Sequence, residues 1–113
     1  MFNSVTYVAL NSALDGLALR QRAIANNVAN VNTPNFHATR VSFEEQLSKQ
    51  VARGNGAVKA TSASSLEPTR LDGNNVNLES ETLLNIDTGL RYQVALRAVD
   101  STYSSLRIAM RSN

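Results

Sequence analysis

The sequence predicts a mainly all-α fold, in which an N-terminal and a C-terminal helix pack antiparallel as a coiled-coil hairpin. An irregular middle segment with short extended stretches joins them. Two observations predict this fold: apolar residues recur every three or four positions at both ends of the chain, and the repeat is lost between them. We expect the helices at about residues 3–31 and 78–111. The chain then divides into an N-terminal helix (1–32), a flexible middle (33–76) and a C-terminal helix (77–113), which together form one assembly domain.

The N-terminal helix is predicted from an uninterrupted apolar seam. Its members alternate in steps of three and four and include one glutamine: Tyr7, Leu10, Leu14, Leu17, Gln21, Ile24, Val28 and Val31. Gly16 lies beside the seam and weakens the helix by about 1 kcal/mol relative to alanine. Thr33-Pro34 ends the helix, because proline disfavours helical geometry in the residue before it.

The last turns of this helix hold four asparagines within seven residues, Asn26, Asn27, Asn30 and Asn32. Such side chains are costly in a helix because their amides compete for nearby backbone groups. A chain that only buried an apolar stripe would place Glu, Lys or Gln on the outer face. A plain helix C-terminus is the simpler alternative, since asparagine is common there. We interpret the amides instead as an assembly signal, a surface that lies close against other backbones.

The middle segment, roughly Thr33 to Asn75, has no helical repeat. Residues 38–43 alternate weakly, as in a short strand or an extended arm. Residues 43–51 could form a short helix with Ser42 as its N-cap. Residues 52–57 and 60–65 are rich in turn formers, and we interpret them as a mobile linker.

The C-terminal helix is predicted to follow a turn at residues 72–75. Asn77 can cap it, and Glu79 and Glu81 suit the positive end of a helix dipole. An apolar stripe begins at Leu83, Ile86 and Leu90 and continues through Tyr92, Leu96, Val99, Tyr103, Leu106 and Met110. Because two helices give each stripe only one partner, we expect both seams to complete their burial on other subunits.

Composition gives little support to catalysis or metal binding. The 113 residues contain no cysteine, so no thiolate site exists, and the single histidine, His37, lies in a flexible region and gives no credible catalytic triad. Glu44 and Glu45 are adjacent, so their side chains diverge and cannot act as a catalytic pair. A formal net charge of +2 does not demand nucleic acid, and we interpret Arg20 and Arg22 as a solvated helix face. The N-terminus lacks the features of a cleaved secretory signal, and no run is long enough for a membrane span.

The asparagine-rich segment carries a resemblance to a known family. Residues 25–36, Ala-Asn-Asn-Val-Ala-Asn-Val-Asn-Thr-Pro-Asn-Phe, resemble the signature Ala-Asn-Asn-x-Ala-Asn-x-x-Thr-x-Gly-aromatic of the rod, hook and hook-associated axial proteins of the bacterial flagellum. The chain's short length and its Thr-Pro pair favour a rod protein. The motif residues in this segment are Asn26, Asn27, Ala29, Asn30, Thr33, Pro34 and Phe36.

A second segment, residues 72–81, resembles the motif Asp-Gly-Asn-x-Val-Asp-hydrophobic-x-x-Glu of the proximal rod proteins in that family. The motif residues here include Asp72, Gly73, Asn74 and Val76. Two positions depart from the family pattern: Asn35 replaces a glycine and Asn77 replaces an aspartate. Asparagine tolerates left-handed backbone geometry better than most residues, so we expect the turn at Asn35 to be kept.

The resemblance implies a structural protein of the proximal rod in the flagellar basal body, without cofactor, nucleic acid or small-molecule substrate. It implies polymerisation through the terminal helices into a hollow shaft that transmits torque and surrounds the export channel. The implied partners are copies of the chain, other rod proteins, the basal-body ring and the type III export gate, which exports such proteins to the periplasmic rod without a cleaved signal. The residues expected to pack in this assembly are Leu10, Leu14, Leu17, Ile24, Val28, Val31, Leu96, Val99, Tyr103, Leu106 and Met110.

Two other classes stay open on the residues alone. A small helical DNA-binding or regulatory protein would explain the arginines, but it predicts a basic recognition helix after a short turn. A secreted helical-hairpin effector or chaperone predicts two helices that pair internally and form a stable soluble monomer.

Overall fold

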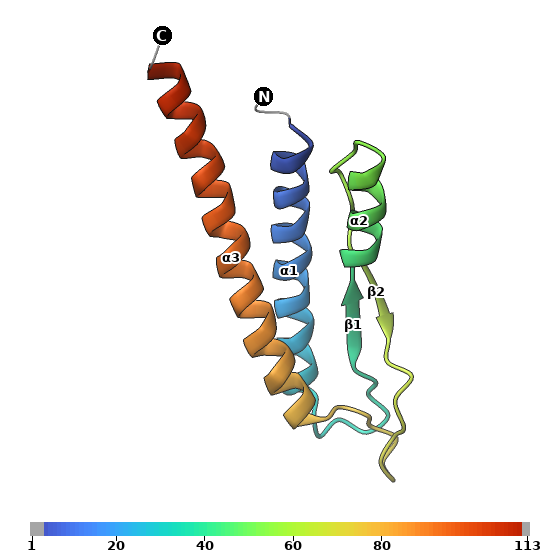
Figure 1. The fold of residues 1–113 in the computed structure, drawn as a ribbon. Coiled ribbons are helices and arrows are strands. Elements are labelled where there is room, and N and C mark those ends of the chain that lie inside the picture. Colours follow the sequence, from blue (N-terminus) through green and yellow to red (C-terminus); the bar gives the residue numbers. More distant parts are fainter. Residues whose placement is uncertain (1–3, 112–113) are drawn as a thin grey trace.

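The computed structural model describes residues 4–111 and shows a long helical hairpin beside a short two-stranded sheet (Figure 1). The elements in chain order are α1 (Val5–Ala29), β1 (Thr39–Ser42), α2 (Glu44–Ala52), β2 (Thr61–Ser64) and α3 (Leu78–Arg111). Helices α1 and α3 run antiparallel and pack against one another, while the two-stranded sheet and α2 lie along the other side of α1 (Figure 1). The prediction of a mainly helical fold with long terminal helices is confirmed.

Helix α1 has a capped start and an early end. The Ser4 hydroxyl accepts a hydrogen bond from the Tyr7 N–H (3.2 Å), as an N-cap does. The helix ends at Ala29, two residues before the expected boundary, and the Asn30 N–H is shared among the last carbonyls of the helix. Val31, the expected last member of the seam, therefore lies beyond the helix, because the chain turns before Thr33-Pro34 is reached.

Helix α3 is continuous over 34 residues, and its predicted cap is confirmed by a bond from the Ser80 N–H to Asn77 Oδ1 (3.2 Å). Its buried residues are Glu81, Thr88 and Ala95, which recur at intervals of seven. This spacing is that of a helix–helix seam, but its members are small or polar rather than large and apolar. No helix within residues 4–111 has both the length and the apolar character needed to cross a membrane.

The predicted C-terminal stripe does not form a single buried face. Tyr92, Val99 and Leu106 are half-buried, whereas Leu96, Tyr103 and Met110 are exposed. The beginning of the stripe, Leu83, Ile86 and Leu90, is exposed to 69%, 57% and 60%. The large apolar residues of α3 thus surround much of the helix, and one set of them faces solvent, away from α1.

The turn-rich stretch expected to be a linker contains β2. Strands β1 and β2 pair antiparallel, with Thr39 opposite Ser64 and Ser42 opposite Thr61. Ser42 therefore ends β1 instead of capping α2, and Phe43 occupies the cap position without a side-chain bond. The prediction of an extended segment at 38–43 and a helix at 43–51 is confirmed, but the predicted capping residue is wrong.

The loop between α2 and β2 is fixed to α1 rather than free. The Ser12 hydroxyl donates to the Gly56 carbonyl (2.6 Å) and accepts from the Val58 N–H (3.0 Å). Gly56 is buried against the backbone of α1, where an added Cβ would lie 2.5 Å from Val5 O. The segment predicted to be a mobile linker is therefore held against α1, at a glycine that permits the close approach.

The core lies where α1, α2 and α3 meet. Leu17, Phe43 and Ala95 form its buried centre, and the Phe43 ring packs over Gly16 of α1. The Arg20 guanidinium covers the same ring, 5.1 Å from its centroid. The absence of a side chain at Gly16 therefore makes room for the Phe43 ring, which offsets the low helix propensity of glycine.

We expect Gly16→Ala to lower the free energy of unfolding. The added Cβ would lie 2.5 Å from Phe43 Cδ1, and the ring is only 4% exposed, so it has little room to move. Overpacking of about 1–3 kcal/mol exceeds the gain of about 1 kcal/mol in helix propensity. The matched control is Gly89→Ala in α3, where the Cβ would meet nothing within 4 Å and should stabilise the helix. Urea unfolding of both variants measures the difference, and a stabilised Gly16→Ala would contradict this packing.

Candidate functional site

The two sequence motifs, residues 25–36 and 72–81, meet at the closed end of the hairpin, where α1 ends and α3 begins (Figure 1). Asn74 is fully buried between them. Its Nδ2 donates to the carbonyls of Asn30 and Thr33 (both 2.8 Å), and its Oδ1 accepts from the Val76 N–H (2.7 Å). One amide thus holds both motifs together, and we call this contact and its neighbours at Asn27, Asn35 and Asn75 the motif junction.

Asn75 connects the motif junction to the two-stranded sheet. Its Oδ1 accepts from the Ala38 N–H (2.7 Å), and its Nδ2 donates to the carbonyls of Ser65 (3.2 Å) and Glu67 (3.1 Å). These backbone groups lie just before β1 and just after β2, beyond the pair Thr39–Ser64. The buried amide satisfies them in place of a further strand.

The departure at Asn35 is accommodated as predicted. Asn35 has a φ of 62°, in the left-handed region, and its N–H donates to the Asp72 carbonyl (2.9 Å). Gly73 lies against it with a φ of 82°, and a Cβ on Gly73 would overlap the Asn35 side chain. The two left-handed residues therefore pack directly on one another, which a side chain on Gly73 would prevent.

Asn27 binds backbone, but it is the backbone of its own chain. Its Oδ1 accepts from the Thr39 N–H (2.8 Å), and its Nδ2 donates to the Thr39 carbonyl (3.0 Å) and to Glu81 Oε1 (2.8 Å). Both Asn27 and Glu81 are fully buried, and Arg40 Nη1 lies 2.7 Å from Glu81 Oε2. The interpretation of the asparagines as a surface for other subunits is wrong for Asn27, whereas its neighbour Asn26 is exposed.

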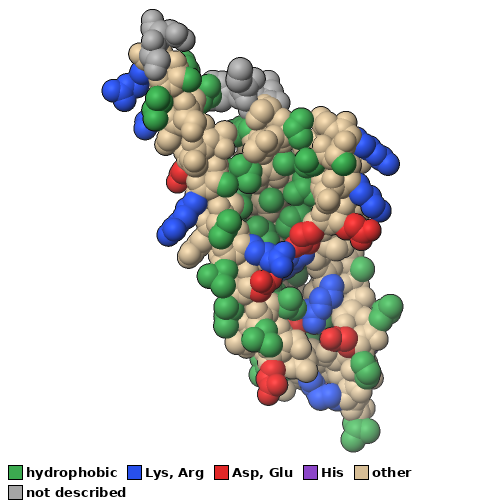
Figure 2. All heavy atoms as spheres, in the orientation of Figure 1, with side chains coloured by type: hydrophobic (Ala, Val, Ile, Leu, Met, Phe, Trp, Pro, Cys, Tyr) green, Lys and Arg blue, Asp and Glu red, His purple; other side chains and the backbone are tan. Residues whose placement is uncertain are grey.

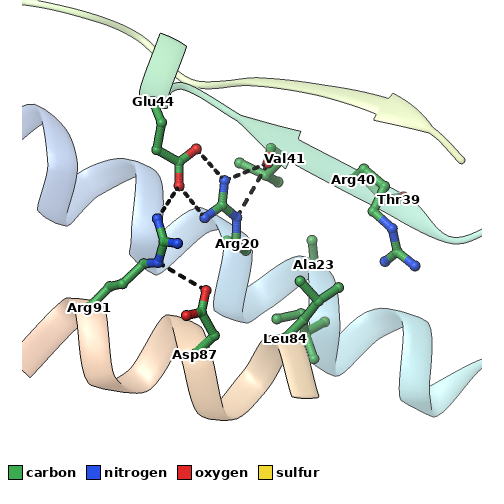
Figure 3. Close-up of a pocket in the computed structure, with 10 residues that line it drawn as sticks. Arg20, Ala23, Thr39, Arg40, Val41, Glu44, Leu84, Asp87 and Arg91 are labelled. Carbon is green, nitrogen blue, oxygen red and sulfur yellow. Dashed lines mark hydrogen bonds and ion pairs between the residues drawn. The ribbon is translucent and has the colours of Figure 1, made fainter. Parts of the chain in front are cut away.

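A second polar cluster joins the three helices around Glu44 (Figure 3). The Glu44 carboxylate is 2.6 and 2.7 Å from the two terminal nitrogens of Arg20 on α1, and 3.5 Å from Arg91 on α3. Arg20 also donates to the Val41 carbonyl (2.8 Å), and Arg91 pairs with Asp87 (2.9 Å). The Arg20 side chain is only 14% exposed, so its expected place on a solvated face is wrong.

The hydrogen bonds from Arg20 lower the pKa of the Glu44 carboxyl below its usual value of 4.5, and burial opposes this shift. The same bonds raise the pKa of Arg20. Both shifts favour the charged pair in the folded state. The pair therefore stabilises the folded chain wherever Glu44 is ionised.

The folded pKa of Glu44 is lowered, so its contribution to stability is present above about pH 4.5 and is lost as the pH falls through the folded value. We expect Glu44→Gln to flatten the acid side of the stability curve and to leave less stability at neutral pH. The matched control is Glu45→Gln, because the Glu45 side chain is 83% exposed and pairs only across one turn with Lys49. Urea unfolding at a series of acidic pH values checks this, and equal curves for both variants would contradict it.

The residues predicted to pack in an assembly fall into three groups of exposure. Leu17 and Ile24 are buried; Leu10, Leu14, Val31, Val99 and Leu106 are half-buried; Val28, Leu96, Tyr103 and Met110 are exposed. Their role between subunits stays a prediction.

Sequence reasoning missed Arg20, Arg40 and Glu81 as structural residues. A signal was present in α1 and α3, because Arg20 and Asn27, like Glu81 and Thr88, are seven positions apart and so share a helix face. Polar residues that recur on one face at this spacing indicate a polar helix contact.

The polar residues of the site form a network of hydrogen bonds and ion pairs. Within residues 4–111 no three His, Cys, Asp or Glu side chains gather as a metal ion would require. Most of the buried polar groups hold one another: amides bind backbone, and carboxylates bind arginines, whereas the buried Thr88 hydroxyl has no hydrogen-bond partner within residues 4–111. Such a network fixes the relative position of α1, α3 and the two-stranded sheet.

Comparison with known proteins agrees with the two motifs. Residues 9–37 match the family "Flagella basal body rod protein". The "Flagellar basal body rod protein FlgB" of Borrelia hermsii is 31% identical, over 87% of this chain and 90% of that protein. The proteins of the same name from Bacillus subtilis (26% identical; 95% of this chain, 94% of that protein) and Escherichia coli (28%; 88% and 88%) are also similar. This chain therefore belongs to the FlgB family of flagellar basal body rod proteins, which are structural components of the rod and not enzymes.

Proposed function

We propose that this chain polymerises with copies of itself and with other rod proteins into the hollow proximal rod, which transmits torque and encloses the export channel. At its base the polymer contacts the basal-body ring and the type III export gate. The chain reaches the periplasmic rod through that gate without loss of a cleaved signal. The two long helices supply the contacts between subunits, as the apolar seams suggest.

The observation that carries this proposal is the apolar outer surface of α3. Leu83, Ile86, Leu90 and Val94 follow one another at helical spacing and are each more than half exposed. A continuous apolar stripe on the solvent side of a helix is typical of a surface that another protein covers. In an elongated molecule measuring 66 × 25 × 14 Å, that burial requires other subunits.

The test is complementation of a strain that lacks the gene. We expect the unaltered chain to restore swimming and to be recovered from purified basal bodies with the mass of the uncleaved chain. Leu83→Asp combined with Leu90→Asp should abolish both swimming and recovery, because a charge is costly in an apolar contact. Both positions are exposed, so circular dichroism should show an unchanged fold.

The matched control is Gln93→Asp, at an exposed polar position of the same helix. It should assemble and swim normally. Absence of the unaltered chain from basal bodies would overturn the proposed function, and normal swimming of the double variant would overturn the role of the outer face of α3.

A further inference from the structure

An apolar groove lies between α2 and α3 over the upper half of α1. Its volume is about 620 Å³, within the range of about 300–1,000 Å³ typical of binding pockets. Leu10, Ala13 and Leu17 of α1 form its floor, and α2 and α3 form its walls. Figure 2 shows apolar side chains gathered in this hollow, with charged side chains directly below them. The Glu44–Arg91 pair belongs to both the groove lining and the polar cluster, so it marks the lower end of the groove.

The walls of the groove carry exposed apolar side chains that have no helix to cover them within residues 4–111. Val51 of α2 is 41% exposed, and Leu90 and Val94 of α3 are 60% and 68% exposed. Helix α2 also contributes Leu47, which is half-buried against the core. The floor, two walls and open top have the form of a groove that receives an amphipathic helix.

The same chain carries a helix face that fits such a groove. Leu83 and Ile86, on the outer side of the first turns of α3, are 69% and 57% exposed. They cannot enter the groove of their own chain, because α3 forms its wall. Leu90 and Val94 continue this stripe up to the groove, so stripe and groove form one continuous apolar surface.

We propose that the groove receives the first turns of α3, centred on Leu83 and Ile86, from a second copy of this chain. The groove and the stripe are different surfaces, and the proposed contact is heterologous, with one groove and one stripe used in each pair. Each copy in such a pair leaves one groove and one stripe unfilled, and the series extends instead of closing as a dimer. This inference rests on the proposed function, because an extending series is what a rod needs, and it names the surfaces that join successive copies.

The absence of cysteine from the sequence allows a direct test by disulfide cross-linking in basal bodies. A strain that lacks the gene is given two versions of the chain, Ser48→Cys in the groove and Thr82→Cys beside Leu83. Both positions are exposed, both changes are small, and neither removes an apolar side chain from the groove or the stripe. After mild oxidation we expect a disulfide-linked dimer, in several-fold excess over cells that carry either version alone.

The matched control replaces Ser48→Cys by Gln46→Cys, which lies on α2 but outside the groove lining. Equal linking from Gln46→Cys, or a Thr82→Cys chain that links equally well to itself, would overturn the groove assignment. So would basal bodies that contain both versions without linked dimer, although the proposed function would then stand. If the unaltered chain is also absent from basal bodies, the proposed function fails together with the groove.

Discussion

Asn27→Ala is expected to lower the free energy of unfolding by about 3 kcal/mol. The change removes three hydrogen bonds, two to the Thr39 backbone and one to Glu81. Asn27 and Glu81 are both fully buried, so the groups that lose their bond to Asn27 cannot form hydrogen bonds with bulk water instead. Alanine raises the helix propensity of α1, but by less than about 0.7 kcal/mol, and cannot offset this loss.

The control for this prediction is the neighbouring Asn26→Ala. Asn26 is exposed, and its side chain accepts a single long bond from Asn30 (3.3 Å). This variant should be as stable as the unaltered chain or slightly more so. Urea unfolding monitored by circular dichroism compares the two, and similar stabilities would show that the buried amide does not hold β1 against α1.

Arg40→Met is expected to cost about 3 kcal/mol, because it leaves the Glu81 carboxylate buried without its cation. Glu81 is completely buried, whereas the Arg40 side chain is 30% exposed and is 2.7 Å from it. The aliphatic part of methionine keeps much of the arginine packing, so the loss reports mainly on charge. The double variant Arg40→Met, Glu81→Met should regain most of the lost stability, since it removes the unpaired charge as well.

A surface pair made by the same arginine supplies the control for that experiment. Arg40 also approaches Glu67, at 3.5 Å, and the Glu67 side chain is 51% exposed. Glu67→Gln should therefore change the unfolding free energy by less than about 1 kcal/mol. If the double variant is no more stable than Arg40→Met alone, the buried charge is not the cause of the loss.

The long helices could be predicted because their apolar spacing is a local property of the chain. The cap at Asn77 was also predictable, since it depends on residues within a few positions. The left-handed turn at Asn35 was predictable because asparagine, which tolerates this geometry, stands where the family signature has glycine. Strand β2 could not be predicted: its four residues, Thr-Ser-Ala-Ser, are all exposed, and pairing with β1 makes them a strand. Composition describes such a segment as a linker because the stabilising bonds come from another part of the chain.

The contact face of α3 was missed for a related reason. Glu81, Thr88 and Ala95 face α1, while the larger Leu83, Ile86 and Leu90 face outward. A hydropathy pattern assigns the largest apolar residues of a helix to its contact with the nearest helix. In this chain, small and polar side chains of α3 make that contact with α1 instead. The large residues are left on the solvent-facing side of α3, where we propose that another subunit covers them. Arg20 was misassigned in the same way, because Glu44 is 24 positions away.

The motif junction sets the order in which this protein can become structured during synthesis. The Asn30 carbonyl meets Asn74, 44 positions later, and Asn27 meets Glu81, 54 positions later. Closing a loop of that size costs about 3 kcal/mol of chain entropy, which only the completed set of contacts can repay. A ribosome makes α1 and β1 first, and the bonds that tie them to the start of α3 cannot form until residues 74–81 have been made. The tie between the end of α1 and the start of α3 is therefore among the last contacts that the growing chain can make.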